Sequence, residues 1–123
     1  MSLLAALFLM TQPIAPEALE VFESRETDLI TLSSQLGRLH RLNQVCPSSG
    51  NITVYRERMK EIIDGERPRR ETRESMIAHF NQGYRDMTEL HFTCSNRAEA
   101  DFRNQAMRAL WISERLASPF FLR

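Results

Sequence analysis

The sequence predicts an all-α protein, an up-and-down antiparallel helical bundle with three long helices, one shorter helix and one disulfide. Apolar residues recur at intervals of three and four in four successive segments, as they do on the buried face of a helix. Proline and glycine punctuate the chain, and no stretch alternates in the manner of a half-buried strand. With 123 residues the chain is long enough for one domain with a sizeable core.

The first helix is expected to begin at about Pro16 or Thr27 and to end at Cys46, because Pro47 cannot continue it. Its predicted buried face contains Leu29, Leu32, Leu36, Leu39, Asn43 and Cys46. A second, shorter helix is expected over about residues 51–64, before Gly65. Its apolar positions are Ile52, Tyr55, Met59 and Ile62.

The third helix is expected to run from about Pro68 to Cys94. Its apolar face contains Met76, Phe80, Gly83, Met87, Leu90 and Cys94, widened by Ile77, Tyr84 and His91. Ser95 or Asn96 caps the fourth helix, and Glu99 stands at the spacing of a capping box with Asn96. The buried face of this helix contains Phe102, Ala106, Ala109, Ile112 and Leu116. We therefore place the bundle at residues 16–118.

Both ends of the chain are apolar. Residues 1–15 contain an apolar stretch far shorter than the roughly 20 residues that span a bilayer. This segment is interpreted either as a signal peptide or as an apolar arm, which would also allow peripheral contact with a membrane. Residues 119–123 form a short apolar tail after the last helix.

The two cysteines are expected to form a disulfide. Cys46 ends the apolar face of the first helix and Cys94 that of the third, so in an up-down-up path both lie at one end of the bundle. Closing this loop stabilises the fold by about 4 kcal/mol on the chain-entropy estimate. Two alternatives stay open, which are buried free thiols and a metal site that adds His91.

Two glycines inside helices, Gly37 and Gly83, need an explanation because each costs about 1 kcal/mol relative to alanine. They lie at similar heights below the predicted disulfide, so we expect a close approach of the first and third helices there. The neighbouring polar residues are interpreted as a buried hydrogen-bond network or, alternatively, as a ligand pocket. This candidate group contains Asn43, Asn81, Gly83, Tyr84 and Arg85.

A candidate protein interface lies near the C-terminus. Met107 and Trp111 are one turn apart on the fourth helix, away from its predicted buried face, and Phe120 and Phe121 follow in the tail. Either the tail covers Trp111, or these residues form an exposed patch. A second candidate is the basic run at residues 67–73, which includes Arg69 and Arg70 and opens the third helix.

No catalytic site is expected. The sequence lacks the serine, zinc and phosphate-loop motifs of common enzymes, and its three histidines are scattered. No cofactor or bound metal is predicted. Acidic and basic residues balance, 16 against 16, which argues against binding to nucleic acid.

Several motifs occur in an order that resembles an uncharacterised family of small, secreted, helical alphaproteobacterial proteins. They are LGRLHRL and VC at residues 36–46, YRERM at 55–59, FNQGYR at 80–85 and TC at 93–94. The resemblance covers roughly residues 29–116 and implies export to the periplasm and a disulfide, but no activity. Asn43, Pro47, Tyr55 and Ser95 depart from the family pattern. Asn43 stands where the family usually has an arginine, which weakens any inference of a site built on that arginine.

From these features we expect a non-catalytic periplasmic interaction or scaffold protein with a protein partner. An envelope or membrane-associated complex is one setting that fits this expectation. One alternative is a small-ligand binding protein with a polar pocket between the first and third helices. The other is a cytoplasmic regulator that depends on free thiols or a metal.

Overall fold

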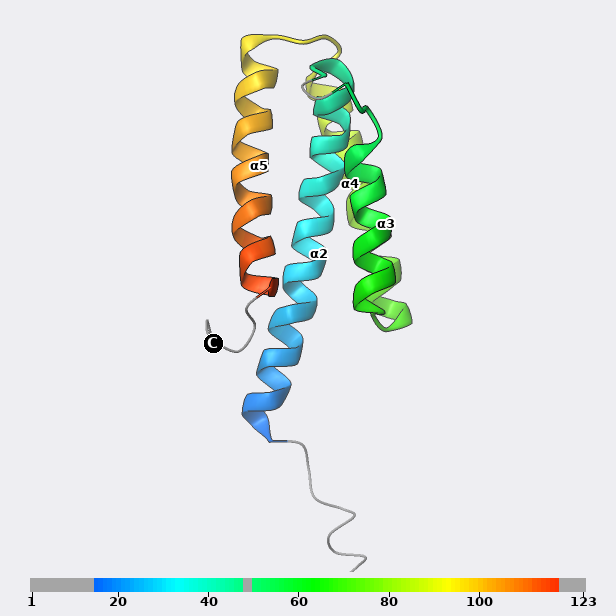
Figure 1. Ribbon diagram of the computed structural model, residues 1–123, viewed down its shortest axis with the longest axis vertical. Helices are drawn as coiled ribbons and strands as arrows, with labels where there is room; N and C mark the ends of the chain where they lie inside the picture. Colours follow the sequence, from blue (N-terminus) through cyan, green and yellow to red (C-terminus); the bar gives the residue numbers. More distant parts are fainter. Residues whose placement is uncertain (1–14, 48–49, 118–123) are drawn as a thin grey trace, which may run out of the picture.

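Four antiparallel helices make up the computed structural model, which describes residues 15–47 and 50–117. They are α2 (Pro16–Val45), α3 (Val54–Glu66), α4 (Arg70–Leu90) and α5 (Asn96–Ala117), as Figure 1 shows. The predicted fold class of three long helices, one shorter helix and a disulfide is confirmed.

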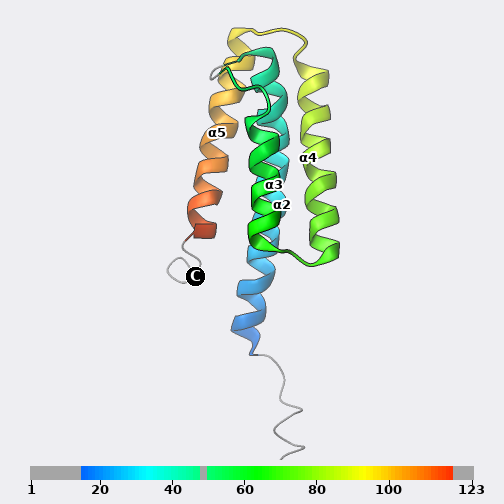
Figure 2. The same ribbon diagram turned by 45° about the vertical axis from the view of Figure 1, so that its right-hand side comes forward.

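The long helix α2 is the centre of the bundle, and each of the other three helices packs against it (Figure 2). Its leucines occupy the core because they recur at helical spacing along one face. The main cluster comprises Leu29, Leu32, Leu36, Leu39, Met59, Met76, Phe80, Ala109, Ile112 and Leu116. A smaller cluster of Leu42, Met87 and Ala98 lies nearer the disulfide. The first turns of α2 extend past the other helices (Figure 1).

The junction between α4 and α5 differs from the expectation in one respect. We expected the third helix to continue to Cys94 with Leu90 buried, but α4 ends at Leu90, whose exposed fraction is 60%. His91 is extended and buried instead. Because the backbone leaves the helical conformation at this residue, its side chain no longer follows the spacing of the faces of α4. The hydroxyl of Ser95 accepts a hydrogen bond from the N–H of Ala98 (3.0 Å), so Ser95 caps α5 as one of the two expected candidates.

Backbone contact between α2 and α4 explains the two glycines inside these helices. A Cβ atom on Gly37 would lie 1.9 Å from the carbonyl oxygen of Phe80, and one on Gly83 would lie 2.2 Å from that of Ser34. Both obstacles are backbone atoms, which cannot rotate away as the end of a flexible side chain does. The predicted close approach of the first and third helices is therefore confirmed.

Covalent and polar contacts fasten the two ends of the bundle. At one end, Cys46 and Cys94 are joined by the predicted disulfide, which links the end of α2 to the connection before α5. At the other end, the guanidinium of Arg25 donates hydrogen bonds to the carboxylate of Glu66 and to the carbonyl of Leu116. Arg25 on α2 thus holds the last turns of both α3 and α5.

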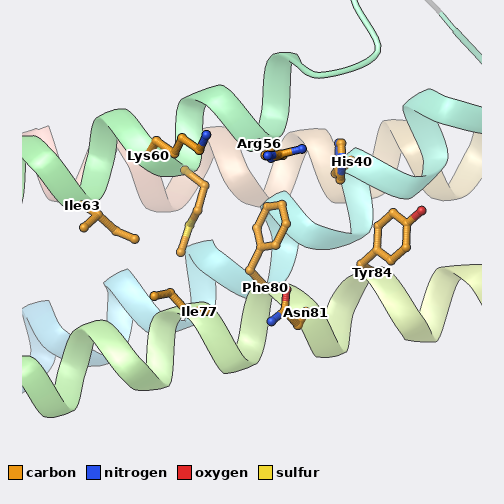
Figure 3. Close-up of a pocket in the computed structure, with 9 residues that line it drawn as sticks. His40, Arg56, Lys60, Ile63, Ile77, Phe80, Asn81 and Tyr84 are labelled. Carbon is orange, nitrogen blue, oxygen red and sulfur yellow. The ribbon is translucent and has the colours of Figure 1, made fainter.

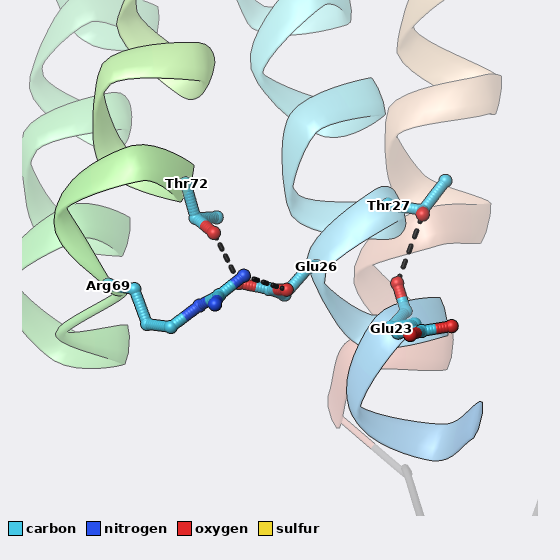
Figure 4. A network of polar contacts seen from close by, with 5 residues as sticks. All are labelled: Glu23, Glu26, Thr27, Arg69 and Thr72. Carbon is cyan, nitrogen blue, oxygen red and sulfur yellow. Dashed lines mark hydrogen bonds and ion pairs between the residues drawn. The ribbon is translucent and has the colours of Figure 1, made fainter. Parts of the chain in front are cut away.

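A second contact ties α2 to the beginning of α4, as Figure 4 shows. Glu26 receives two hydrogen bonds from the guanidinium of Arg69, at 3.0 and 2.8 Å, and a third from the hydroxyl of Thr72. The hydrogen bonds from Arg69 and then Thr72 hold the pKa of Glu26 below its ordinary value. The carboxylate also lies at the N-terminus of α4, where the helix dipole favours negative charge.

We expect Gly37→Ala and Gly83→Ala each to destabilise the protein by about 1–3 kcal/mol, because a Cβ atom forces the two helices apart. Gly65→Ala is the matched control, since a Cβ at Gly65 of α3 meets nothing within 4 Å. There the substitution is expected to leave stability unchanged or to raise it by up to about 1 kcal/mol. Urea unfolding followed by circular dichroism measures all three changes. Equal stabilities for the three variants would contradict the backbone contact.

The Glu26 contact is expected to make stability depend on acidic pH. Because its pKa is lower in the folded state, the unfolded chain takes up the proton first as the pH falls below about 4.5. The stabilisation is therefore complete above that pH and is lost as the pH falls through the folded-state value. Glu26→Gln should lower the free energy of unfolding at neutral pH, and its difference from the wild type should shrink in acid. Glu23→Gln, an exposed neighbour on α2, should show no such convergence.

Candidate functional site

An open groove lies between α3 and α4, with α2 at its floor (Figure 3). Its volume is about 420 Å³. Four side chains come from α3, four from α4, and His40 comes from α2. The lining residues are His40, Arg56, Met59, Lys60, Ile63, Ile77, Phe80, Asn81 and Tyr84. None of them is acidic.

Two cations line the α3 side of this groove. Arg56 and Lys60 are four residues apart and therefore lie on the same side of the helix. Both side chains are exposed, and neither forms an ion pair with any residue that the structure describes. By contrast Arg58, on another side of α3, pairs with Glu61 at 3.2 Å.

His40 is the most enclosed polar side chain of the groove, with an exposed fraction of 8%. Its ring lies between those of Phe80 and Tyr84, at centroid distances of 5.7 and 5.4 Å. Burial, and to a lesser extent the charge of Arg56, lowers the pKa of His40, so its imidazole is neutral at pH 7. Its Nδ1 atom is buried and has no hydrogen-bond partner among residues 15–47 and 50–117.

The structure brings together only two of the five polar candidates from the sequence. Asn81 and Tyr84 line the groove, and the hydroxyl of Tyr84 donates to the side chain of Gln44 at 2.7 Å. Asn43 is buried and donates to the backbone carbonyl of Asn51 at 2.8 Å.

The other two candidates lie elsewhere on α4. Gly83 is occupied by the backbone contact with α2, and exposed Arg85 binds Gln82. At Gly83 the first and third helices pack directly against each other, where a ligand pocket was the alternative interpretation, and the groove lies on the α3 side of α4.

Sequence reasoning did not single out His40, Arg56 or Lys60. The four-residue spacing of Arg56 and Lys60 is the signal that could have placed the two cations on one side of α3, but it does not show that this side faces α4. His40 could not be recognised from the sequence, because its neighbours Phe80 and Tyr84 come from a helix forty residues later. Only the packing of three helices identifies these residues as one site.

A second candidate surface lies on α5, on the side opposite its buried face. We define the α5 strip as Met107, Leu110 and Trp111, with exposed fractions of 70%, 59% and 60%. The guanidinium of Arg115 lies 5.0 Å from the centre of the Trp111 ring. Phe120 and Phe121, which were predicted as part of this interface, lie outside the described residues.

The arginines of the predicted basic interface make contacts within the chain. Arg69 is engaged by Glu26 and also lies over the ring of Phe22, at 5.2 Å from its centre. Arg70 pairs with Glu74 one turn later in α4, at 3.1 Å. Arg69 thus connects the start of α4 to α2, a role that the sequence alone did not indicate.

The metal site considered as an alternative at Cys46, Cys94 and His91 is not formed. The two sulfur atoms are bonded to each other, so neither is available as a thiolate ligand. His91 instead contacts the carboxylate of Asp101 through its Nε2 atom, at 2.6 Å. Among the described residues, no three histidine, cysteine or acidic side chains are grouped for metal binding.

None of the helices in the described part of the chain has a stretch long and apolar enough to cross a membrane. The apolar stretch within residues 1–15, for which a signal peptide or membrane contact is expected, lies outside the described residues.

The sequence was compared with known protein families, curated proteins and solved structures. Residues 25–120 match the family described as "Protein of unknown function (DUF2385)". No curated protein and no solved structure matches the chain. The matched residues include α3, α4, α5 and most of α2. They therefore also include the disulfide, the groove and the α5 strip. The chain therefore belongs to this family, DUF2385.

Proposed function

We propose that this chain is a non-catalytic periplasmic protein that binds a partner protein through the α5 strip. The observation that carries the proposal is the exposure of three large apolar side chains, including the only tryptophan, on the outer side of α5. Side chains of this kind normally lie in a core, and contiguous exposed ones mark interaction surfaces. Tryptophan, methionine and arginine are also the residues enriched at protein interfaces.

The charges around the strip indicate what its partner looks like. Arg103 and Arg108 are exposed on α5, and neither forms an ion pair among the described residues. Arg115 extends over Trp111 and also contacts Asp28 at 3.4 Å. Glu114 is also exposed beside the strip, so basic residues outnumber acidic ones there, and a partner surface with an apolar centre and a mainly acidic rim complements this arrangement.

The disulfide supports the proposed location. Such bonds persist in oxidising compartments, which in bacteria means the periplasm or beyond. The apolar stretch within residues 1–15 is consistent with an export signal.

The location predicts the redox state of the protein in the cell. We expect the chain to fractionate with the periplasm and its intact mass to rise only when reduction precedes alkylation. Free thiols on a chain in the cytoplasmic fraction would contradict the proposed location. A strain that lacks periplasmic oxidising enzymes should accumulate the reduced chain, which serves as the control.

The interface can be tested with a photo-crosslinking residue at Met107, using the same residue at Leu90 as a control. Leu90 is an equally exposed apolar position at the end of α4. We expect one partner to crosslink from Met107 and not from Leu90. The purified partner should then bind Trp111→Ala about tenfold or more weakly than the wild type, while Leu90→Ala should bind normally.

Two experiments test whether the partner surface is acidic. The double variant Arg103→Glu and Arg108→Glu should bind the partner more weakly, and added salt should weaken binding of the wild type. Crosslinks only to a second copy of this chain, or unchanged affinity of Trp111→Ala, would contradict the proposal.

A further inference from the structure

We propose that the groove between α3 and α4 is a binding site for a small organic anion with an apolar body, in the class of aryl or medium-chain carboxylates. This site is separate from the α5 strip and does not depend on the proposed partner. Its volume of about 420 Å³ falls within the range of about 300–1,000 Å³ that is usual for ligand pockets.

The charge of the ligand follows from the two cations on α3. Arg56 and Lys60 are side by side at the groove without a balancing carboxylate, whereas Arg58 on the same helix is paired with Glu61. No acidic residue lines the groove. An anion placed between the two side chains would receive charge-assisted hydrogen bonds from both, and a cation would be repelled.

The apolar body of the ligand follows from the other side chains. Ile63 of α3 faces Ile77 and Phe80 of α4 across the groove (Figure 3). Met59 of α3 also lines it. Ile77 is exposed in the structure, so a ligand that covers it removes apolar surface from water. A purely inorganic anion would leave this surface uncovered.

His40 contributes a polar ring to the floor of the groove. Its neutral ring has one donor and one acceptor nitrogen, but Nδ1 is buried, so this atom does not contact a ligand in the groove. Asn81 adds an amide at the α4 side, beside Phe80 (Figure 3). These neutral polar groups are suited to orienting a ligand that the cations attract.

The site can be tested by titrating the full chain with 4-phenylbutyrate and with 4-phenylbutanol, which share one apolar body and differ in charge. Backbone amide NMR spectra report both the affinity and the location of binding. We expect the carboxylate to shift the amide signals of α3 and α4 around the groove. The alcohol should bind about tenfold more weakly, since it lacks the contribution of two exposed charge contacts.

Variants separate the groove from other apolar surfaces. Arg56→Gln combined with Lys60→Gln should weaken carboxylate binding about tenfold and leave binding of the alcohol unchanged. Arg58→Gln is the matched control on the same helix and should bind normally. Ile77→Asp places an acid in the groove at an exposed position and should abolish binding without unfolding the chain.

Three results would overturn the proposal. They are equal affinity for the carboxylate and the alcohol, an equal loss of binding in Arg58→Gln, and signal changes confined to α5. Trp111→Ala should retain full ligand binding, so a failure of the groove and a failure of the α5 interface are distinguishable.

Discussion

The contact between the backbones of α2 and α4 is the constraint on which the rest of this structure depends. Gly37 and Gly83 remove the two side chains that would otherwise separate the helices. With the helices this close, Phe80 and Tyr84 of α4 lie against His40 of α2. The cost of two glycines inside helices, about 1 kcal/mol each, is offset by the packing that they permit.

A disulfide and polar contacts at the two ends of the bundle stabilise the contact between α2 and α4. The disulfide joins Cys46 to Cys94 at one end, and Arg69 with Thr72 holds Glu26 at the start of α4 at the other. Arg25 secures the ends of α3 and α5 against the same helix. Because every one of these contacts involves α2 or its C-cap, the outer sides of α3, α4 and α5 are left available for binding.

Two outer surfaces differ in the chemistry they offer. The α5 strip is a convex apolar surface with arginines near it, which suits a protein partner. The groove between α3 and α4 is concave and combines two cations with apolar walls, which suits a small organic anion. Nothing in their geometry couples the two, since α2 lies between them (Figure 2).

Local spacing in the sequence was sufficient to predict the helices, the buried leucines of α2, the disulfide and the close approach at Gly37 and Gly83. These features repeat with the period of a helix or lie at matching heights along it, so the spacing of residues along the chain is enough to infer them. The prediction that Leu90 is buried within a longer helix was wrong. The end of α4 depends on the burial of His91, whose imidazole contacts Asp101 of α5, and this contact cannot be read from local spacing.

The sequence could not reveal which side of α3 faces α4, and so it did not identify the groove of His40, Arg56 and Lys60. Nor could it distinguish Arg69, which binds Glu26 within the chain, from an arginine available to a partner. Side chains that are remote in sequence become neighbours only when helices pack at a particular rotation. That rotation is set by the whole core and by no local pattern.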